Sequence, residues 1–462
     1  MSFASLEFLL FFAAVLLPTA LIDRFLPNRA REIFLLVVSY VFYGYCGWYF
    51  CFLLLFVTLS AYFAAGHTEK KSVYLFGIIA PLLLLGIFKY YNFFLTSITA
   101  LLGTETRTLK LLLPVGISFY TFQAISYVVD AKRGKVEPEK DFIRTALYLS
   151  FFPQVLSGPI VRAADLLPQL REGRKISANS LSCGVQIFAF GLLKKMVLAD
   201  NLALFVNDVY HAPSAFHWTT LVLAAVSYSL QIYFDFSGYS DMAIGCAKCL
   251  GYDYKRNFDL PYLSQSVTEF WRRWHISLST WLRDYLYIPL GGNRKGKVRT
   301  YANLFLTFLL GGLWHGADWT FVFWGALNGV ALCVDKFLTN RKGNSLVRAL
   351  RISGTFLFIT LTWVFFRADT FEEAASILRG VITLQNGIVQ PFAWTFAAIA
   401  VLLAATLYAA RKAKRSGETW IGSCYPMLDL TTIKGLTIFF IELGAILGLT
   451  FTGEQPFVYF QF

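Results

Sequence analysis

Long apolar runs recur from the first residues of this chain to the last, separated by short polar connections. A helix rises about 1.5 Å per residue, so about 20 apolar residues cross the hydrocarbon of a bilayer. The pattern therefore predicts an all-α polytopic membrane protein with about 10 to 12 transmembrane helices, plus re-entrant or interfacial helices. The expected single spans are residues 6–22, 73–94, 111–129, 180–200, 219–245, 301–314, 320–334, 352–366, 391–410 and 433–451.

Two further apolar stretches do not fit a single crossing. Residues 33–65 are too long for one span, and Gly44, Gly47 and Trp48 predict a break between two short helices. The stretch 142–162 is interrupted by two proline-containing segments, which favours a re-entrant or interfacial element. Irregular backbone at membrane depth needs protein or a water-filled cavity around it. We therefore expect 142–162 to line an internal space.

The basic residues indicate the orientation of the chain. The net charge is +13, but Lys and Arg fall mainly in short connections, which is typical of topology signals and argues against nucleic-acid binding. Residues 201–218 contain no Lys or Arg and are expected outside, as a loop, whereas 248–299 contain ten and are expected on the cytoplasmic side. No positive charge precedes the first apolar run, and Arg24 follows it, so we expect an uncleaved first helix with its N-terminus outside.

The seven cysteines lie mostly within or beside apolar segments, where a free thiol behaves as a small hydrophobe. Cys246 and Cys249 have a metal-like spacing, but no second ligand pair accompanies them. We interpret them as packing residues and expect no metal site.

His275 lies in a segment rich in tryptophan and arginine. Ser266 and Glu269 have the spacing of a capping box, which predicts a helix that begins there and ends at the Pro and Gly residues of 289–292. Its aromatic residues recur at steps of three and four, as in a helix lying in the membrane interface. On that continuous helix, Trp271, His275 and Ser279 share one stripe. His275 then has a functional role or is an interfacial residue satisfied by headgroups or backbone, and the pattern favours neither.

His315 follows the apolar run 304–310 and a pair of glycines, and an ionisable side chain inside a membrane segment is a functional-site hypothesis by default. We expect Trp314, Trp319 and Trp324 to surround it. Glycines nearby should allow neighbouring backbone or substrate to approach closely; they are at positions 311, 312, 316 and 325. Burial disfavours imidazolium, so a neutral general base is favoured over a structural hydrogen bond between helices.

The motifs around His275 and His315 resemble those of a known protein family. The segment 271–293, which begins Trp271-Arg272-Arg273-Trp274-His275, and the later Gly312-Leu313-Trp314-His315-Gly316 resemble the signature of the alginate O-acetyltransferase membrane proteins, within the membrane-bound O-acyltransferase superfamily. Three other segments are similar as well, namely 152–162, 235–241 and 457–462. One departure is Asn328, where relatives often have histidine.

The resemblance implies a single integral membrane domain over 1–462 with a central tunnel. Its N-terminal helices would lie in 1–129, its catalytic core at about 142–340 and its C-terminal helices in 350–462. It also implies a multi-pass protein of the bacterial inner membrane, in contact with lipids. Its function would be to move an acetyl group from a cytoplasmic thioester, such as acetyl-CoA, for O-acetylation of an extracytoplasmic polysaccharide such as alginate. No bound cofactor is expected, and an extracytoplasmic, esterase-like O-acetyltransferase would be its partner.

The resemblance assigns two catalytic-site residues. The deep histidine, His315, would be the catalytic residue, and His275 would lie on the donor side, where it orients or hydrogen-bonds the thioester. Basic residues beside these motifs are candidates to bind the donor phosphates, namely Arg272, Arg273, Arg294 and Lys295. Polar and aromatic residues are candidates to line the tunnel, namely Trp271, Trp274, Ser279, Trp314, Asp235, Asp241 and Asn328.

Two alternatives stay open at this point. Within the superfamily, a D-alanyl or other acyl transferase acting on a cell-wall polymer would share the same motifs. A polysaccharide-related transporter or flippase would also use broken helices and intramembrane carboxylates such as Asp235 and Asp241. A transporter, however, has no need of two histidines beside a tryptophan-rich helix.

Overall fold

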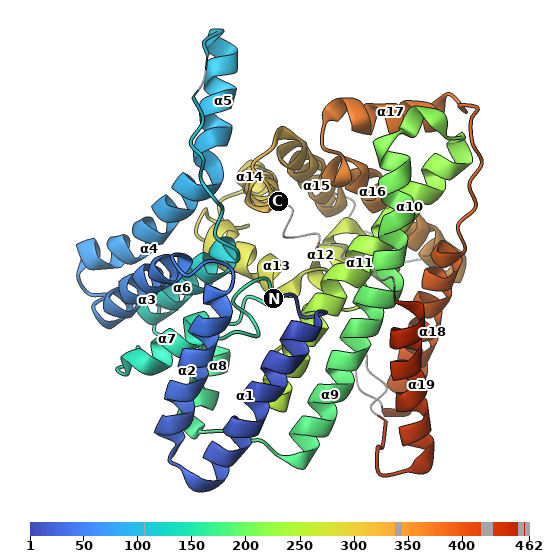
Figure 1. Ribbon diagram of the computed structural model, residues 1–462. Coiled ribbons are helices and arrows are strands. Elements are labelled where there is room, and N and C mark those ends of the chain that lie inside the picture. The colour runs from blue at the N-terminus through green and yellow to red at the C-terminus, as the bar shows by residue number, and fades with distance from the viewer. Residues whose placement is uncertain (106, 338–343, 417–427, 451–456, 458–462) are drawn as a thin grey trace. The chain divides into compact units, whose positions relative to one another are not determined.

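The computed structural model describes residues 1–105, 107–337, 344–416, 428–450 and 457. Over these residues the chain is helical and contains no β-strand, only an isolated bridge between Phe216 and Ile388 (Figure 1). The predicted all-α class is confirmed.

The described chain forms two compact units. Unit 1 comprises 1–188 and 240–255, and unit 2 comprises 189–239 and 256–462. The helices of unit 1 are α1 (Leu6–Phe25), α2 (Asn28–Gly44), α3 (Phe50–Gly66), α4 (Lys71–Leu85), η1 (Gly86–Tyr90), α5 (Tyr91–Leu102), α6 (Ile117–Lys132), α7 (Phe142–Ser150), α8 (Ala163–Glu172) and most of α9 (Ala178–Leu192).

Unit 2 contains both histidines singled out by the sequence. Its helices are η2 (Leu193–Ala199), α10 (Asp200–His211), η3 (Pro213–Ala215), most of α11 (Trp218–Cys249), η4 (Pro261–Leu263), α12 (Val267–Arg273), α13 (Ile276–Leu282), η5 (Arg283–Tyr287), α14 (Lys297–His315), α15 (Trp319–Phe337), α16 (Ser345–Arg367), α17 (Phe371–Ile382), α18 (Ala393–Ser416) and α19 (Ile433–Leu449).

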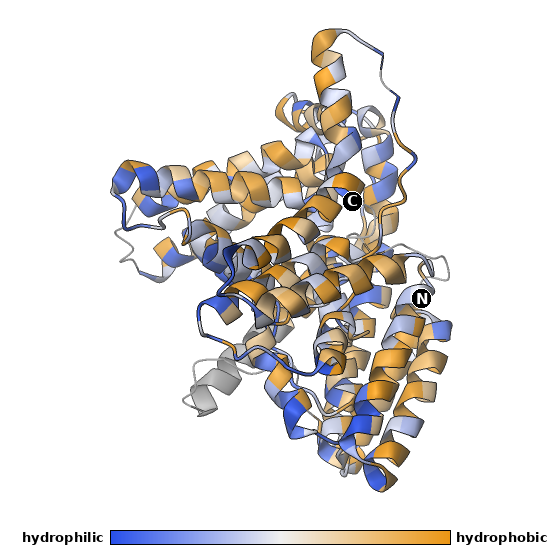
Figure 2. Cartoon of the chain, turned by 90° about the vertical axis from the view of Figure 1, so that its left-hand side faces the viewer, coloured by the Kyte–Doolittle hydropathy of each residue, from blue (hydrophilic) through white to orange (hydrophobic). Residues whose placement is uncertain are grey.

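Four helical runs within the described residues are long and apolar enough to cross a membrane by length and composition. They are Leu6–Phe25, Lys71–Leu102, Ala178–His211 and Ser345–Arg367. In Figure 2 hydrophobic residues run along most helices, while hydrophilic residues gather in the connections. The chain is a membrane protein, and the expected number of about 10 to 12 crossings stays a prediction.

The break expected within 33–65 is confirmed, because α2 ends at Gly44 and α3 begins at Phe50. Gly47 in the connection has a φ of 146°, a region that side chains disfavour. Each of the two consecutive helices is 17 residues long, which is close to the lower limit of length for a helix that crosses a membrane.

The interrupted stretch 142–162 is irregular after α7, as predicted, and is buried in protein. That it lines an internal space stays a prediction. Its polar groups find partners inside unit 1. The backbone N–H of Phe152 donates to Oγ of Ser39 at 3.1 Å, and Nε2 of Gln154 donates to the carbonyl oxygen of Tyr148 at 2.6 Å. At Gly116 a Cβ atom would collide with the carbonyl oxygen of Val155, so the absence of a side chain lets the two segments touch.

Two expectations about the elements were wrong, and one helix was missed. The helix expected at 111–129 begins only at Ile117, because Pro114 and the left-handed Gly116 precede it. The loop expected over 201–218 is mostly α10, whose apolar residues pack inward although polar residues interrupt the run. The short amphipathic helix α17 was not predicted, because its length and polarity fit no span.

Candidate active site

The predicted continuous helix around His275 is wrong, since the chain breaks there into α12 and α13. The capping serine is confirmed, with the N–H of Glu269 donating to Oγ of Ser266 at 3.1 Å. His275 itself has a φ of 42°, which is incompatible with a helix and rare for a residue other than glycine. His275 therefore does not share a helical stripe with Trp271 and Ser279.

A buried asparagine from an earlier loop explains the break. The carbonyl oxygen of Asn257 accepts from the N–H of Ile276 at 2.9 Å. Oδ1 of Asn257 accepts from the N–H of Ser277 at 3.1 Å and from its hydroxyl at 2.9 Å. In a continuous helix the N–H groups of Ile276 and Ser277 would donate to carbonyl oxygens one turn earlier, in α12. Asn257 accepts from both groups instead, and so caps α13.

The same asparagine fixes the tautomer of His275. Nδ1 of His275 lies 3.2 Å from Oδ1 of Asn257. Because that oxygen also accepts from a backbone N–H, the ring nitrogen must be the donor, and the lone pair resides on Nε2. His275 is 0% exposed and lies between two seven-residue helices, outside any segment able to span a membrane. Burial lowers the pKa of His275 to about 3, so the ring is neutral near pH 7.

His315 is the last residue of α14 and is 5% exposed. Its ring contacts those of Trp314, Trp324 and Phe366, with centroid distances of 5.0, 5.1 and 5.4 Å. The expected surroundings are thus confirmed for two tryptophans. The third, Trp319, is 53% exposed, and Phe366 from α16 stands in the expected position instead.

The glycines beside His315 allow close helix packing, as predicted. A Cβ atom on Gly312 would collide with the carbonyl oxygen of Phe321, and one on Gly316 would collide with the ring of Phe321. The Cα atom of Gly325 would lie 3.0 Å from the Gly312 Cβ. The backbones of α14 and α15 therefore meet where His315 is placed.

Both histidines contact one indole. The ring of Trp314 lies 6.2 Å from that of His275 and 5.0 Å from that of His315. Further aromatic contacts surround this pair, with Trp324 stacked on Trp363 at 5.5 Å and Trp363 lying 5.1 Å from Trp274. The folded chain thus brings together two buried imidazoles, 40 positions apart in sequence, in an apolar and aromatic environment.

A cavity of about 450 Å³ lies beside this cluster in unit 2; we call it the α12–α15 cavity. It is lined by Thr268, Trp271, Arg272, Ile276, Ser279, Thr280, Leu282, Arg283, Tyr287, Leu304, Thr307, Phe308 and Leu332. Three predicted site residues, Trp271, Arg272 and Ser279, are therefore neighbours. Arg283, which also lines the cavity, was not predicted as a binding residue. Its position four residues after Ser279 could have indicated this role, because residues four apart lie on the same face of a helix.

Trp271 connects this cavity to the aromatic cluster. Its indole lies 5.5 Å from that of Trp324, which contacts His315. Nε1–H of Trp271 donates to Oδ1 of Asn328 at 3.2 Å, and Asn328 is 0% exposed. Asn328 therefore orients a residue of the cavity wall and does not itself line the α12–α15 cavity.

The other predicted donor-binding residues are not in the cavity lining. Arg273 pairs with Glu269 at 2.8 Å and donates to the carbonyl oxygen of Asp259 at 3.3 Å. Arg294 and Lys295 are exposed in the connection before α14. Their part in donor binding stays a prediction.

The two predicted carboxylates belong to different units. Asp235 in unit 2 is 1% exposed and lies 2.8 Å from Nζ of Lys195, which also contacts Asp200 at 2.6 Å. The next residue, Phe236, places its ring 4.6 Å from that of His275. This buried ion cluster therefore anchors the part of α11 that packs on His275. Asp241 belongs to unit 1, and its role in the tunnel stays a prediction.

Of the C-terminal motif at 457–462, only Phe457 falls within the described residues. Its ring stacks on that of Tyr239 at 4.4 Å and lies 5.8 Å from that of Phe236. Cys246 and Cys249 are buried free thiols. Over the described part of the chain, no group of three His, Cys, Asp or Glu residues could hold a metal ion.

Comparison with known proteins tests the resemblance directly. The probable alginate O-acetylase AlgI of Pseudomonas putida is 43% identical over 392 residues, which cover 81% of this chain and 79% of that protein. The peptidoglycan O-acetyltransferase of Helicobacter pylori is 39% identical over 362 residues, covering 72% of this chain and 68% of that protein. The teichoic acid D-alanyltransferase of Bacillus subtilis is 27% identical over 277 residues, covering 56% and 70%.

The model of the membrane-bound O-acyltransferase family matches residues 138–368, which include both histidines and the α12–α15 cavity. The resemblance drawn from the sequence motifs is confirmed, and the protein is an O-acyltransferase, an enzyme that uses an acyl donor. From the extent of the family match and from the identity to the Pseudomonas proteins, the chain belongs to the membrane-bound O-acyltransferase family.

Proposed function

We propose that this protein takes an acetyl group from a cytoplasmic thioester such as acetyl-CoA and passes it across the bacterial inner membrane, where it O-acetylates an extracytoplasmic polysaccharide such as alginate. The observation that carries the proposal is the pair of buried histidines on one indole beside the α12–α15 cavity. The chain supplying them is 43% identical to a probable alginate O-acetylase.

In the proposed reaction His315 is the general base. The acceptor hydroxyl gives its proton to the neutral imidazole as its oxygen attacks the thioester carbonyl, forming a tetrahedral oxyanion. The carbonyl re-forms as the carbon–sulfur bond breaks, and the thiolate leaving group takes a proton back from the imidazolium. A base at this position contributes about 10²- to 10⁴-fold to the rate. The aromatic surroundings of His315 exclude water, which limits hydrolysis of the donor.

His275 serves the donor by accepting a hydrogen bond. Its Nδ1–H is directed to Asn257, so Nε2 carries a lone pair and no proton. Donation to the thioester carbonyl would need the imidazolium, which burial disfavours. An N–H or O–H group of the donor is therefore the fitting partner for Nε2, and His275 orients the donor.

The donor enters through the α12–α15 cavity. Arg272 and Arg283 line it, and guanidinium groups bind phosphates with paired, charge-assisted hydrogen bonds. Trp271 closes the side toward Trp324 and His315. A phosphate-bearing carrier such as coenzyme A would thus be held at the mouth while its thioester extends toward the histidines.

The acceptor side involves an extracytoplasmic, esterase-like transferase that completes transfer to the polymer. Alginate is favoured over peptidoglycan because several relatives described as probable alginate O-acetylases are 41–44% identical, against 39% for the peptidoglycan enzyme. A D-alanyl transferase is the second candidate, but the B. subtilis relative is 27% identical over 56% of this chain.

The decisive variant is His315→Gln, which keeps much of the size and polarity of the side chain but cannot act as a base near neutral pH. It should lower labelled acetyl transfer from acetyl-CoA by at least about 100-fold, or about 3 kcal/mol of transition-state stabilisation. Transfer is measured per mole of monodisperse protein, with the extracytoplasmic partner supplied.

The matched control is His67→Gln, at an exposed histidine just after α3, whose ring nitrogen Nδ1 lies 3.0 Å from the carbonyl oxygen of Phe63. It should transfer acetyl at the wild-type rate. If His315→Gln also retained near wild-type transfer, His315 would be a structural residue and the proposed chemistry would fail.

A further inference from the structure

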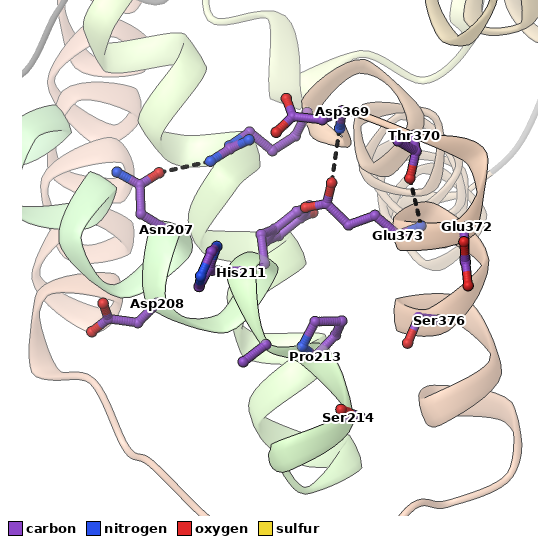
Figure 3. Close-up of a pocket in the computed structure, with 13 residues that line it drawn as sticks. Asn207, Asp208, His211, Pro213, Ser214, Asp369, Thr370, Glu372, Glu373 and Ser376 are labelled. Atoms are coloured by element: carbon purple, nitrogen blue, oxygen red, sulfur yellow. Dashed lines mark hydrogen bonds between the residues drawn. The ribbon is translucent and has the colours of Figure 1, made fainter.

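A second hollow in unit 2 shares no lining residue with the α12–α15 cavity. It has a volume of about 900 Å³ and lies between the end of α10 and the junction of α16 with α17; we call it the α10–α17 pocket. Figure 3 shows Asn207, Asp208, His211, Pro213 and Ser214 on one side and Asp369, Thr370, Glu372, Glu373 and Ser376 on the other.

The pocket lies at the ends of two helical runs that are long and apolar enough to cross a membrane, and the charge pattern indicates that these ends are extracytoplasmic. Ala178–His211 and Ser345–Arg367 both end at the pocket. Both begin beside basic segments, at residues 171–175 and 341–351. The positive-inside rule therefore places the basic ends in the cytoplasm and the α10–α17 pocket outside.

The pocket is acidic in a chain whose net charge is +13. Four carboxylates line it, those of Asp208, Asp369, Glu372 and Glu373, against the single guanidinium of Arg367. With histidine neutral, three negative charges are left over. A concave site lined by one sign of charge focuses its field and attracts ligands of the opposite sign.

Contacts inside the pocket neutralise little of this charge. Arg367 donates to Oδ1 of Asn207 at 2.8 Å, and Glu373 accepts from the N–H of Asp369 at 2.8 Å (Figure 3). Among the residues the structure describes, the carboxylates of Asp208, Asp369 and Glu372 form no ion pair. These groups are available to a ligand.

A buried tyrosine gives an independent indication that something binds here. Tyr210 lines the pocket and is 1% exposed, and within the described chain its hydroxyl oxygen has no hydrogen-bond partner. The guanidinium carbon of Arg367 lies 5.4 Å from its ring centroid, and the charges of Arg367 and Glu373 both act on the hydroxyl. Buried hydroxyls almost always have a partner, so a ligand in the pocket would complete this one.

The chemistry of the pocket selects the ligand. No group of three metal-binding side chains is present in the described residues, and about 900 Å³ is far more than a single ion occupies. A polyuronate chain is repelled by the unpaired carboxylates. A peptide segment bearing Lys or Arg fits both the charge and the volume.

We propose that the α10–α17 pocket docks a basic segment of the extracytoplasmic partner protein. This inference rests on the proposed function, which requires such a partner, and it names the surface and chemistry of the contact. A Lys or Arg side chain entering the pocket would pair with Asp208 or Glu372 and donate to the hydroxyl oxygen of Tyr210. Charge complementarity of this kind raises the rate of encounter and selects the partner.

The test uses the full-length protein in lipid nanodiscs and a fluorescent hexalysine peptide, with binding followed by anisotropy at low ionic strength. Wild-type protein should bind hexalysine but not hexaglutamate. The double variant Asp208→Asn/Glu372→Gln should weaken binding about tenfold or more. Tyr210→Phe, which removes only the hydroxyl, should weaken it several-fold.

The matched control, Glu137→Gln/Glu172→Gln, removes the same charge from exposed positions in unit 1 and should bind hexalysine like wild type. Equal affinity of the two double variants would overturn the proposal. Displacement of the peptide by an uncharged or uronate oligosaccharide at equimolar concentration would also overturn it, because the pocket would then be a polysaccharide site. Peptide binding needs no acetyl transfer, so His315→Gln protein should bind hexalysine normally, which separates this test from that of the proposed function.

Discussion

His275 should make the folded protein less stable as the pH falls. Its ring is buried and neutral in the folded chain, where burial lowers its pKa from 6.5 to about 3. In the unfolded chain the imidazole takes up a proton below pH 6.5, whereas the folded chain does not until about pH 3. The unfolded state therefore binds more protons across this window, and the free energy of unfolding decreases as the pH decreases.

The lowered pKa of His275 determines how much unfolding free energy is lost on acidification. Each pH unit below the unfolded pKa costs about 1.36 kcal/mol, so lowering the pH to about 5 removes about 2 kcal/mol. This is a large fraction of the stability of a typical domain. Above about pH 7.5 the contribution of His275 to the pH dependence should vanish.

The assay compares unfolding at about pH 7.5 and about pH 5 for wild type and His275→Asn, in detergent micelles, by tryptophan fluorescence. Asparagine tolerates the positive φ of this position and cannot titrate. The variant should be less stable at both pH values but should lose about 2 kcal/mol less than wild type on acidification. His67→Asn, at an exposed histidine, should keep the wild-type difference. Equal losses in wild type and His275→Asn would show that His275 is not buried and neutral, and would refute the reasoning.

Three further predictions concern orientation, donor binding and helix packing. Cysteine introduced at Ser214 should react with an impermeant thiol reagent from outside the cell and cysteine at Asn293 should not; labelling of both from one side would contradict the topology. Arg272→Ala should raise the apparent KM for acetyl-CoA about tenfold with little change in kcat, because a charge-assisted phosphate contact is lost, and an unchanged KM would remove Arg272 from the donor site. Gly312→Ala should sharply lower the yield of folded protein, because its methyl group would collide with the backbone of α15. The control Gly354→Ala, which has open space around the added methyl group, should not lower the yield. Equal yields of the two variants by size-exclusion chromatography would contradict the packing.

The class of this protein and its chemistry were predictable from local pattern. Apolar runs of spanning length can only be helices in a membrane, because backbone groups in hydrocarbon must be satisfied within the segment. The break near Gly47 and the irregular stretch 142–162 were predictable for the same reason, since glycine and proline act on their own backbone. The motifs around His275 and His315 carried the family, which the comparisons confirm.

The tertiary structure decided what the histidines can do. Periodicity predicted one helix through His275, but Asn257, 18 residues earlier, bonds the backbone at Ile276 and Ser277 and breaks it. The same contact fixes the proton on Nδ1. No local pattern contains this information, because a hydrogen bond from a distant loop outweighs the weak helix propensity of a single residue.

Which basic residues gather around a cavity was also decided by the fold. Four were equally plausible in the sequence, yet only Arg272 lines the α12–α15 cavity, joined by Arg283, while Arg273 pairs with Glu269. The sequence alone therefore determined that this chain is a helical membrane acyltransferase and singled out His275 and His315 as candidate site residues. Only the folded chain determined the tautomer of His275, the indole that both histidines share and the cavity beside them, because these depend on contacts between side chains far apart in the sequence.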